Sequence, residues 1–244
     1  MGAQAALSSP APQLSVVMPL YNEGTHIVHN VEQTQSALRI LGSFEIILVN
    51  DGSSDNSGEE IARLAAAHAG EIVSLHLPRS GKGAALRQGA LAARGDYVVF
   101  LDSDLDIPPE QILFFVAIQR VKKADAVIGS KMHPDSTVDY PLIRRVYSLG
   151  YFWLVKMLFG LPVRDTQTGL KLVRRDLLLR ALEKTESQGF TLDLELLVRL
   201  AQLGAVMVEA PVVVEYKMKF GGIGLPVVWQ IFRDTWRVWR RTRS

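Results

Sequence analysis

The feature that most constrains the fold is an alternation of strand-like and helix-like segments through the first hundred residues. Four runs of β-branched and apolar residues, each bounded by turn formers, predict buried strands at residues 14–20, 44–50, 72–77 and 97–102. Apolar residues spaced three and four apart predict intervening helices at residues 24–41, 55–69 and 82–93. This order predicts an α/β fold with a mostly parallel sheet flanked by helices. Ligands of such sheets bind beyond the carboxyl ends of the strands, so polar residues there are candidate site residues.

The composition fits one globular domain within 244 residues, with 48% hydrophobic and 21% charged residues. The absence of Cys excludes a disulfide framework and a thiolate nucleophile or metal ligand. Residues 1–13 lack the basic start and apolar centre of a signal peptide, and we expect a disordered leader there. No apolar run reaches the roughly 20 residues that a membrane-spanning helix needs. We expect one domain at residues 14–222 and a basic helix at residues 223–244.

In the second half of the chain, the regular alternation of short strands and helices gives way to longer helices. A fifth strand is predicted at residues 124–130, and helices are predicted at 140–159 and 191–203. The Val-rich segment 205–216 reads as extended, and Pro211 within it favours a sheet edge or a bend. The last helix is predicted to begin near Pro226, because proline is favoured in a first helical turn.

The first two strands end in polar motifs, VVMPLYNEG at residues 16–24 and VNDGSSD at residues 49–55. Asp51 is suitably placed to accept a hydrogen bond from a base or ribose, and Glu23 to contact the same nucleotide. The alternative is turn chemistry, since Asn-Asp-Gly-Ser favours a tight connection and Asp55 is a good helix cap. Both interpretations stay open at this point.

The fourth strand ends in FLDSDLDIPPE, where Asp102, Asp104 and Asp106 are spaced by two. Three crowded carboxylates repel one another unless a cation lies between them, and oxygen ligands without His or Cys suit Mg²⁺ or Mn²⁺. A metal bridging to a diphosphate explains the motif. The alternative is an acidic loop that caps the helix starting near Pro108. An EF-hand is excluded, because the required Gly and Glu positions are missing.

The segment SGKGAALRQG at residues 80–89 is close to a phosphate-binding P-loop but does not match one. His76 stands where the first Gly belongs, and Gly83 stands where Ser or Thr would bind magnesium. Lys82 at a helix start is still able to meet a phosphate or sugar. A solvated lysine is the alternative.

These four motifs, in this order, resemble the family 2 glycosyltransferases of the GT-A fold, with Asp102-Ser103-Asp104 as the DxD motif. The resemblance covers residues 15–220. It implies one Rossmann-like GT-A domain, with Pro19, Tyr21, Glu23, Asp51, Lys82, Asp102, Ser103 and Gln167 binding the nucleotide sugar. It further implies Mg²⁺ or Mn²⁺ held by Asp102, Asp104 and Asp106, and catalytic positions at Asp104, Asp165, Lys171 and Glu195.

The second half narrows the resemblance to polyprenyl-phosphate sugar synthases, through GSKMH, RRVYS, RDTQTGLKL and FTLDLELL. The motifs GKGAALRQG and RDTQTGLK are more similar to dolichyl-phosphate glucosyltransferases than to mannose synthases. By this resemblance Lys131, Arg144 and Ser148 contact the acceptor phosphate, although Lys131 stands where Arg is usual and so loses the bidentate fork. Ile223-Gly224 departs from the Ser-Lys expected after the glycine turn near Gly221.

The implied reaction is metal-dependent inverting transfer of a hexose, with UDP-glucose favoured and GDP-mannose open, to a polyprenyl or dolichyl phosphate. A lipid phosphate is already an anion, so its attack on the anomeric carbon requires no general base. Lys131, Arg144 and Lys171 would orient the two mutually repelling anions. An alcohol acceptor would need a carboxylate base, for which Asp165, Asp193 and Glu195 are the candidates.

The tail carries an apolar stripe of Val228, Trp229, Phe232, Trp236 and Trp239 beside four arginines. A basic, Trp-rich amphipathic helix is able to lie on anionic lipid. The alternative is a terminal helix whose aromatic residues pack on the domain. The same choice arises for Tyr147, Tyr151, Phe152 and Trp153 in the earlier helix, where the sequence favours packing in the core.

The leading hypothesis therefore places the protein at the cytoplasmic membrane face, peripherally bound through the C-terminal helix. The alternative within the enzyme class is a soluble family 2 transferase with a small-molecule or saccharide acceptor. A remote alternative is a non-catalytic protein that binds membrane or nucleic acid through the tail. The acidic balance outside the tail argues against nucleic acid. The sequence leaves the oligomeric state undetermined.

Overall fold

The computed structural model describes residues 12–138, 142–187, 189, 191–215 and 225–243. Most of the expected leader, the turn near Gly221 and the Ile223-Gly224 departure lie outside the described residues. At the start of the described chain, the Gln13 amide donates to the Ser43 carbonyl at 3.1 Å.

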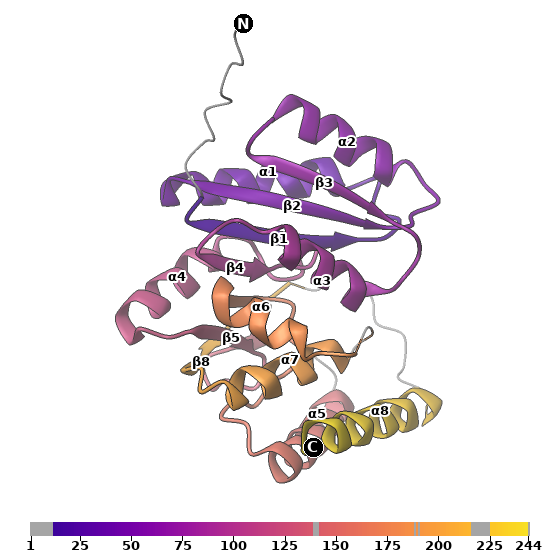
Figure 1. Ribbon diagram of the computed structural model, residues 1–244, viewed down its shortest axis with the longest axis vertical. Helices are drawn as coiled ribbons and strands as arrows, with labels where there is room; N and C mark the ends of the chain where they lie inside the picture. Colours follow the sequence, from indigo (N-terminus) through magenta and orange to yellow (C-terminus); the bar gives the residue numbers. More distant parts are fainter. Residues whose placement is uncertain (1–11, 139–141, 188, 190, 216–224, 244) are drawn as a thin grey trace, which may run out of the picture.

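A seven-stranded sheet in the order β3-β2-β1-β4-β7-β5-β8 forms the centre of the molecule (Figure 1). The strands are β1 (Leu14–Leu20), β2 (Phe44–Asp51), β3 (Ile72–Leu77), β4 (Tyr97–Phe100), β5 (Ala126–Ser130), β7 (Lys171–Arg174) and β8 (Met207–Pro211). All of their pairings are parallel except those of β7, which runs antiparallel between β4 and β5. The predicted α/β architecture with a mostly parallel sheet is confirmed.

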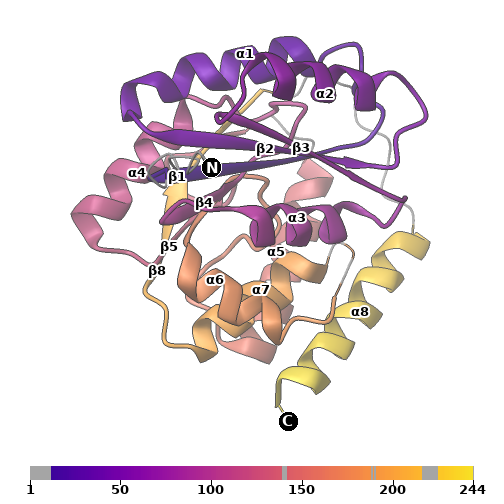
Figure 2. The same ribbon diagram turned by 45° about the horizontal axis from the view of Figure 1, so that its top comes forward.

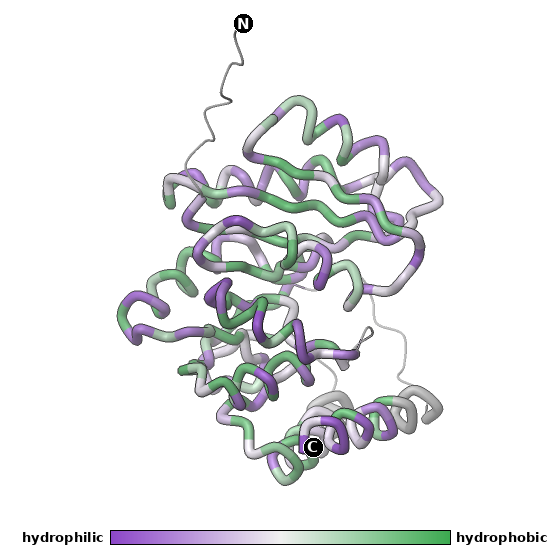
Figure 3. The backbone as a smooth tube through the Cα atoms, viewed as in Figure 1, coloured by the Kyte–Doolittle hydropathy of each residue, from purple (hydrophilic) through white to green (hydrophobic). Residues whose placement is uncertain are grey.

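Helices cover both faces of the sheet (Figure 2). One apolar core joins one face to α1 (Ile27–Leu38), α2 (Ser57–Ala67) and α4 (Gln111–Lys122). A second core joins the other face to α3 (Lys82–Ala92), α6 (Arg175–Glu183) and α7 (Thr191–Gln202). Because both faces are covered, the central strands are mostly apolar (Figure 3), and all seven residues of β1 are buried.

Two long helices, α5 (Leu142–Phe159) and α8 (Leu225–Arg243), lie together at one end of the molecule (Figure 1). Val155 of α5 and Val238 of α8 are buried in the same core as α6 and α7. A short 3-10 turn, η1 (Arg39–Leu41), follows α1, and β6 (Thr137–Val138) pairs with β9 (Val213–Val214). Among the described residues, no helix combines the length and apolar character needed to cross a bilayer.

The predicted elements match the structure closely in the first half. Residues 14–20 and 72–77 form strands with the predicted bounds, whereas the fourth strand ends at Phe100 instead of residue 102. The strand ends early because β7 pairs with it only from Tyr97 to Phe100. The sequence analysis missed β7 and α6. The extended segment after residue 205 does take the sheet edge, as β8.

Candidate active site

Parallel pairing of β1, β2 and β4 brings their carboxyl ends, and the loops that follow, to one edge of the sheet. A cleft of about 360 Å³ opens there, within the usual size range of ligand pockets. Its lining includes eight of the residues predicted for donor or metal binding: Pro19, Tyr21, Glu23, Asp51, Lys82, Asp102, Ser103 and Asp104. Leu20, Arg79, Gly81 and Gly189 complete the lining. The three strand-end motifs therefore form one site.

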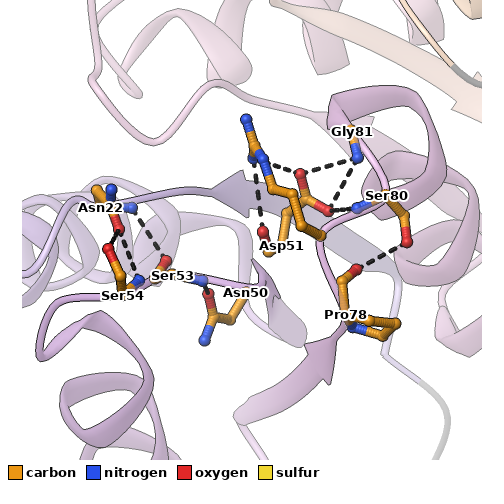
Figure 4. A network of polar contacts seen from close by, with 9 residues as sticks. Asn22, Asn50, Asp51, Ser53, Ser54, Pro78, Ser80 and Gly81 are labelled. Carbon is orange, nitrogen blue, oxygen red and sulfur yellow. Dashed lines mark hydrogen bonds and ion pairs between the residues drawn. The ribbon is translucent and has the colours of Figure 1, made fainter.

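Asp51, at the end of β2, accepts hydrogen bonds from the loop that follows β3 (Figure 4). Its carboxylate accepts from Arg79 Nη1 at 2.6 Å, from the Ser80 amide at 2.7 Å and from the Gly81 amide at 3.0 Å. Gly81 has a φ of +92°, a conformation that side chains rarely tolerate. These contacts fix the loop after β3 against the end of β2.

Arg79 is a cleft residue that the sequence analysis missed. Its guanidinium carbon lies 3.3 Å from the centroid of the Tyr21 ring, while Nη1 binds Asp51. Arg79 thus connects two predicted nucleotide-binding residues from two different strand ends. The sequence did contain a clue to Arg79, because this residue follows closely after the third strand and so lies at the same sheet edge as the acidic motifs.

Turn chemistry accounts for the neighbours of Asp51 but not for Asp51 itself. Asn50 accepts from the Ser53 amide at 2.9 Å, and Asn22 accepts from the Ser54 amide at 2.9 Å. Asp55 accepts from the amides of Gly24 and Ser57, each at 3.0 Å. The hydrogen bond from the Ser57 hydroxyl is the main reason that the pKa of Asp55 lies below its ordinary value. The turn interpretation of the VNDGSSD motif is therefore confirmed for Asn50 and Asp55, and the nucleotide contact of Asp51 stays a prediction.

The DxD motif lies in a tight loop after β4. Asp102 forms an ion pair with Lys82, with 2.5 Å between Oδ1 and Nζ. Leu105 is buried at a φ of +51°, a conformation unusual for this residue type. A Cβ atom on Gly169 would lie 2.3 Å from Asp102 Oδ2, so a larger residue there would displace the Asp102 carboxylate. The loop is therefore held in one shape by packing from several elements.

Charge is concentrated around this loop. Burial opposes the charge of Lys82, but the carboxylates of Asp102, Asp193 and Asp104 together raise its pKa above the ordinary value. Burial, reinforced by the charge of Asp102, raises the pKa of Asp104 as well. Extra negative charge at Asp104 is thus unfavourable in the folded protein, and a bound cation would relieve it.

The three aspartates do not converge as a ready-made metal site. Within the described ranges, no group of three His, Asp or Glu side chains is arranged to hold a metal ion. Asp102 is engaged by Lys82, and Asp106 lines only a second, smaller hollow. Asp102 and Asp104 line both hollows, and their carboxylate oxygen atoms are of the type that a divalent cation prefers. Both would be available to such an ion if Lys82 released Asp102.

The second hollow has a volume of about 90 Å³ and shares Asp102 and Asp104 with the larger cleft. Its lining consists of Asp102, Asp104, Asp106, Ile107, Lys131, Gln167, Gly169 and Val214. Lys131 and Gln167, predicted to bind acceptor and donor respectively, therefore lie in the same hollow.

Asp165 lies beneath the second hollow and holds its wall together. Its carboxylate accepts from the Lys131 amide at 3.1 Å, the Gln167 amide at 3.0 Å and the Thr168 hydroxyl at 2.7 Å. Lys131 Nζ lies 3.8 Å away. Burial opposes ionisation, but the Lys131 charge and these hydrogen bonds hold the pKa of Asp165 below its ordinary value.

Lys171 and Glu195 lie deeper in the fold. Lys171 is almost fully buried, and its Nζ donates to Asp193 at 2.9 Å and to the Thr168 carbonyl. Glu195 accepts from the Ser187 amide at 3.0 Å and from the Ser187 hydroxyl at 2.6 Å. Neither residue lines the two hollows. Their hydrogen bonds connect β7 and the segment before α7 to α7, and the catalytic role predicted for both residues stays a prediction.

The remaining predicted site residues lie on α5. Ser148 is half-buried there and lines neither hollow. Arg144 belongs to the first turn of the same helix, and its side chain lies outside the described part of the structure.

Comparison with known proteins identifies the family. The model of the family described as glycosyl transferase family 2 matches residues 15–181. The chain belongs to glycosyl transferase family 2. The family 2 resemblance predicted from the motif order is therefore confirmed.

Several relatives narrow the place of the chain within family 2. Glycosyltransferase AglD of Haloferax volcanii is 34% identical over 212 residues, which make up 85% of this chain and 34% of AglD. Dolichyl-phosphate beta-glucosyltransferase ALG5A of Trichomonas vaginalis is 31% identical over 225 residues, or 86% of this chain and 69% of that protein. The chain thus spans about a third of the first relative and about two thirds of the second. The predicted similarity to the polyprenyl-phosphate sugar transferases is confirmed.

Solved structures confirm the GT-A-type fold of this family 2 chain. Glucosyl-3-phosphoglycerate synthase from Mycobacterium tuberculosis, in complex with phosphoglyceric acid, matches with a TM-score of 0.67 at 22% identity. The match covers 95% of this chain and 80% of that one. The same synthase in complex with Mn²⁺ and uridine-diphosphate-glucose matches with a TM-score of 0.65 at 21% identity, over 93% and 79% of the two chains.

Proposed function

We propose that this chain transfers a hexosyl group from a nucleoside diphosphate sugar to a polyprenyl phosphate. The observation that carries the proposal is that Asp102 and Asp104 of the DxD motif line two hollows at once. Tyr21, Asp51 and Lys82 also line the larger hollow, and Lys131 lines the smaller one. A donor and an anionic acceptor would thus meet at the same two carboxylates.

The larger cleft is proposed as the donor site. Tyr21 and Asp51 would hold the base and ribose together with Pro19 and Glu23. Arg79 would fix the positions of the Tyr21 and Asp51 side chains, both of which it contacts. Lys82 would meet the diphosphate, and Gln167 the sugar. UDP-glucose is the proposed donor, because relatives are named dolichyl-phosphate glucosyltransferases and a neighbour of the same fold binds UDP-glucose.

Mg²⁺ or Mn²⁺ is the proposed cofactor, held by Asp102 and Asp104, with Asp106 on the acceptor side. Such an ion stabilises the negative charge of a departing nucleoside diphosphate. Lys82, released from Asp102, would then be free to contact the donor diphosphate. The proposed domain bounds stay at residues 14–222 for the catalytic domain and 223–244 for the basic helix.

The carboxylates near the site support an acceptor that needs no general base. Asp165 is held ionised by three hydrogen-bond donors, Asp193 pairs with buried Lys171, and Glu195 is fully buried beside Ser187. None of these three lines either hollow. A hydroxyl acceptor would have to lose its proton to such a group. A phosphate monoester is already an anion, and Lys131, Arg144 and Ser148 would orient it.

A lipid acceptor places the reaction at a membrane surface. We propose that the protein works peripherally at the cytoplasmic face, with α8 in contact with lipid. The exposed arginines of α8, among them Arg233 and Arg237, favour an anionic surface.

A two-phase transfer assay tests the proposal. Radiolabelled UDP-glucose and GDP-mannose are offered separately, with Mn²⁺ or Mg²⁺, to the full chain and a short polyprenyl phosphate. Label extracted into the organic phase from UDP-glucose is the expected result. If label reaches the organic phase only from GDP-mannose, the donor assignment is wrong. If the donor is consumed while all label stays in water, or is not consumed at all, the lipid-phosphate acceptor is rejected.

A further inference from the structure

Helix α5 exposes three large apolar side chains, including Trp153, for which packing in the core was expected. Leu149, Trp153 and Met157 are 50%, 58% and 77% exposed. They follow one another at intervals of four residues, so they form a single stripe along the helix. Val155 is buried on the opposite side, and Tyr151 is partly buried there. The expectation that the aromatic residues of this helix belong to the core is therefore wrong for Trp153.

Helix α8 also exposes large apolar side chains, while smaller residues face the domain. Thr235, Val238 and Thr242 are buried against the domain, whereas Phe232 and Trp236 are 43% and 44% exposed. Trp239 stacks on Trp236 with 4.6 Å between the ring centroids, which continues the aromatic stripe. A helix that packed only as a cap on the domain would bury its large aromatic residues and expose its threonines.

The two helices lie next to each other and share one contact layer (Figure 1). The Tyr151 hydroxyl of α5 lies 3.3 Å from the Thr235 hydroxyl of α8. Val155 and Val238 are buried in the same core. On each helix the apolar stripe lies away from these inward-facing contacts.

The two helices differ in charge from the rest of the molecule. α5 carries Arg144, Arg145 and Lys156 and no carboxylate, and α8 carries five arginines and one aspartate. The rest of the chain has 19 basic and 24 acidic side chains. Exposed aromatic and aliphatic stripes flanked by arginines match the two parts of an anionic bilayer surface, the acyl boundary and the charged headgroups.

We infer that α5 and α8 together form a docking surface for an anionic phospholipid bilayer, in which α5 inserts Leu149, Trp153 and Met157. The inference extends the proposed function, on which it rests, from one helix to two. It also has a consequence for the acceptor. Because Arg144 and Ser148 belong to α5, docking of this helix would bring the proposed phosphate-binding residues to the headgroup layer.

The absence of Cys from the chain allows a direct test, since an introduced Cys is a unique labelling site. Met157→Cys is labelled with an environment-sensitive fluorophore, and Val121→Cys on α4, equally highly exposed at 79%, is the matched control. The full chain is mixed with vesicles of phosphatidylcholine containing phosphatidylglycerol. A blue shift and brightening at position 157, with no change at 121, is the expected result. No change at 157, or equal changes at both positions, would overturn the inference.

A binding measurement with apolar-to-polar variants completes the test. Trp153→Gln combined with Met157→Gln should weaken binding to the same vesicles about tenfold or more, because two apolar side chains lose their burial. The control, Ile40→Gln combined with Val121→Gln, should bind as the parent does. Thermal unfolding of both variants, near that of the parent, shows that neither is misfolded.

Two further readouts separate the possible failures. Transfer to a water-soluble short-chain polyprenyl phosphate should be as fast in Trp153→Gln/Met157→Gln as in the parent protein. If the parent protein itself does not transfer sugar to this acceptor, the proposed function is rejected and the docking surface is not. Light scattering of the vesicle-free protein detects the competing occupant, a second copy of this chain. A dimer that dissociates in Trp153→Gln/Met157→Gln, with unchanged vesicle binding, would replace the bilayer assignment.

Discussion

At the residue scale, the candidate site contains carboxylates that fix the surrounding loops and one carboxylate whose negative charge is unfavourable. Asp51 and Asp165 accept several hydrogen bonds each and hold the walls of the two hollows. Asp104 is the opposite case, because its ionised form is disfavoured by burial and by Asp102. A site that tolerates unfavourable charge in the free protein gains most when a cation binds.

Asp104→Asn should reduce sugar transfer about a thousandfold, because loss of a metal ligand removes several kcal/mol of charge stabilisation. The folded protein should not be destabilised. The raised pKa of Asp104 means that its charge costs stability near neutral pH, and this cost disappears as pH falls and the group is protonated. The melting temperature of the variant should thus be equal or higher at neutral pH. Asp135→Asn, at an exposed carboxylate, is the control, and normal turnover by Asp104→Asn would contradict the metal-site assignment.

Asp165→Asn should lower the free energy of unfolding by about 2 kcal/mol at neutral pH, because the amide group of Asn cannot accept from all three donors. The pKa of Asp165 lies below its ordinary value of 3.8. Its ionised form therefore stabilises the fold above the unfolded-state pKa, and this contribution is lost as pH falls through the lower folded-state pKa. Denaturant unfolding at several pH values checks this. A difference between parent and variant that stays constant into strong acid would contradict the proposed charge interactions.

At the element scale, the close approach of α3 to the sheet depends on Gly89. A Cβ atom there would lie 2.3 Å from Val17 Cγ1 and 3.0 Å from Val49 Cγ2. Both valines are fully buried in the core and cannot move aside easily. Because α3 begins at Lys82, this packing also sets the position of the Lys82 and Asp102 pair at the cleft.

Gly89→Ala should therefore destabilise the protein by about 1–3 kcal/mol, the usual cost of overpacking a core. Gly150→Ala in α5 is the matched control, since a Cβ atom there meets nothing within 4 Å. That change should stabilise the helix by up to about 1 kcal/mol, through helix propensity alone. Thermal and denaturant unfolding of the two variants measure the contrast. Equal effects in the two helices would show that α3 tolerates a larger separation from the sheet.

At the scale of the whole molecule, charge is distributed unevenly. The small net charge of +2 hides a basic end formed by α5 and α8 and an acidic remainder. Such a molecule would approach an anionic surface with α5 and α8 first, because its acidic part is repelled. The proposed donor and acceptor hollows would then be held at the membrane surface.

Arg237→Gln combined with Arg240→Gln should weaken binding to anionic vesicles about thirtyfold, since each basic residue near such a surface contributes about 1 kcal/mol. The matched control, Arg63→Gln with Arg120→Gln, changes the net charge equally on α2 and α4. Its binding should stay near that of the parent. Raising the salt concentration should reduce the difference between the two variants, because salt screens exposed charges. Equal losses in both variants would show that only net charge matters.

The sequence by itself determined the alternation of elements, the edge of the sheet where the cleft opens and most of the cleft residues. It could do so because continuous apolar strands and the residues after them are local patterns, and parallel pairing brings their ends together. Only the tertiary structure decided what depends on distant segments: the antiparallel insertion of β7, the contact of Arg79 with Tyr21 and Asp51, and the ion pair of Lys82 with Asp102. The outward stripe of α5 belongs here as well. An apolar helix pattern shows which residues share a face, but the neighbours of the helix decide which face is buried.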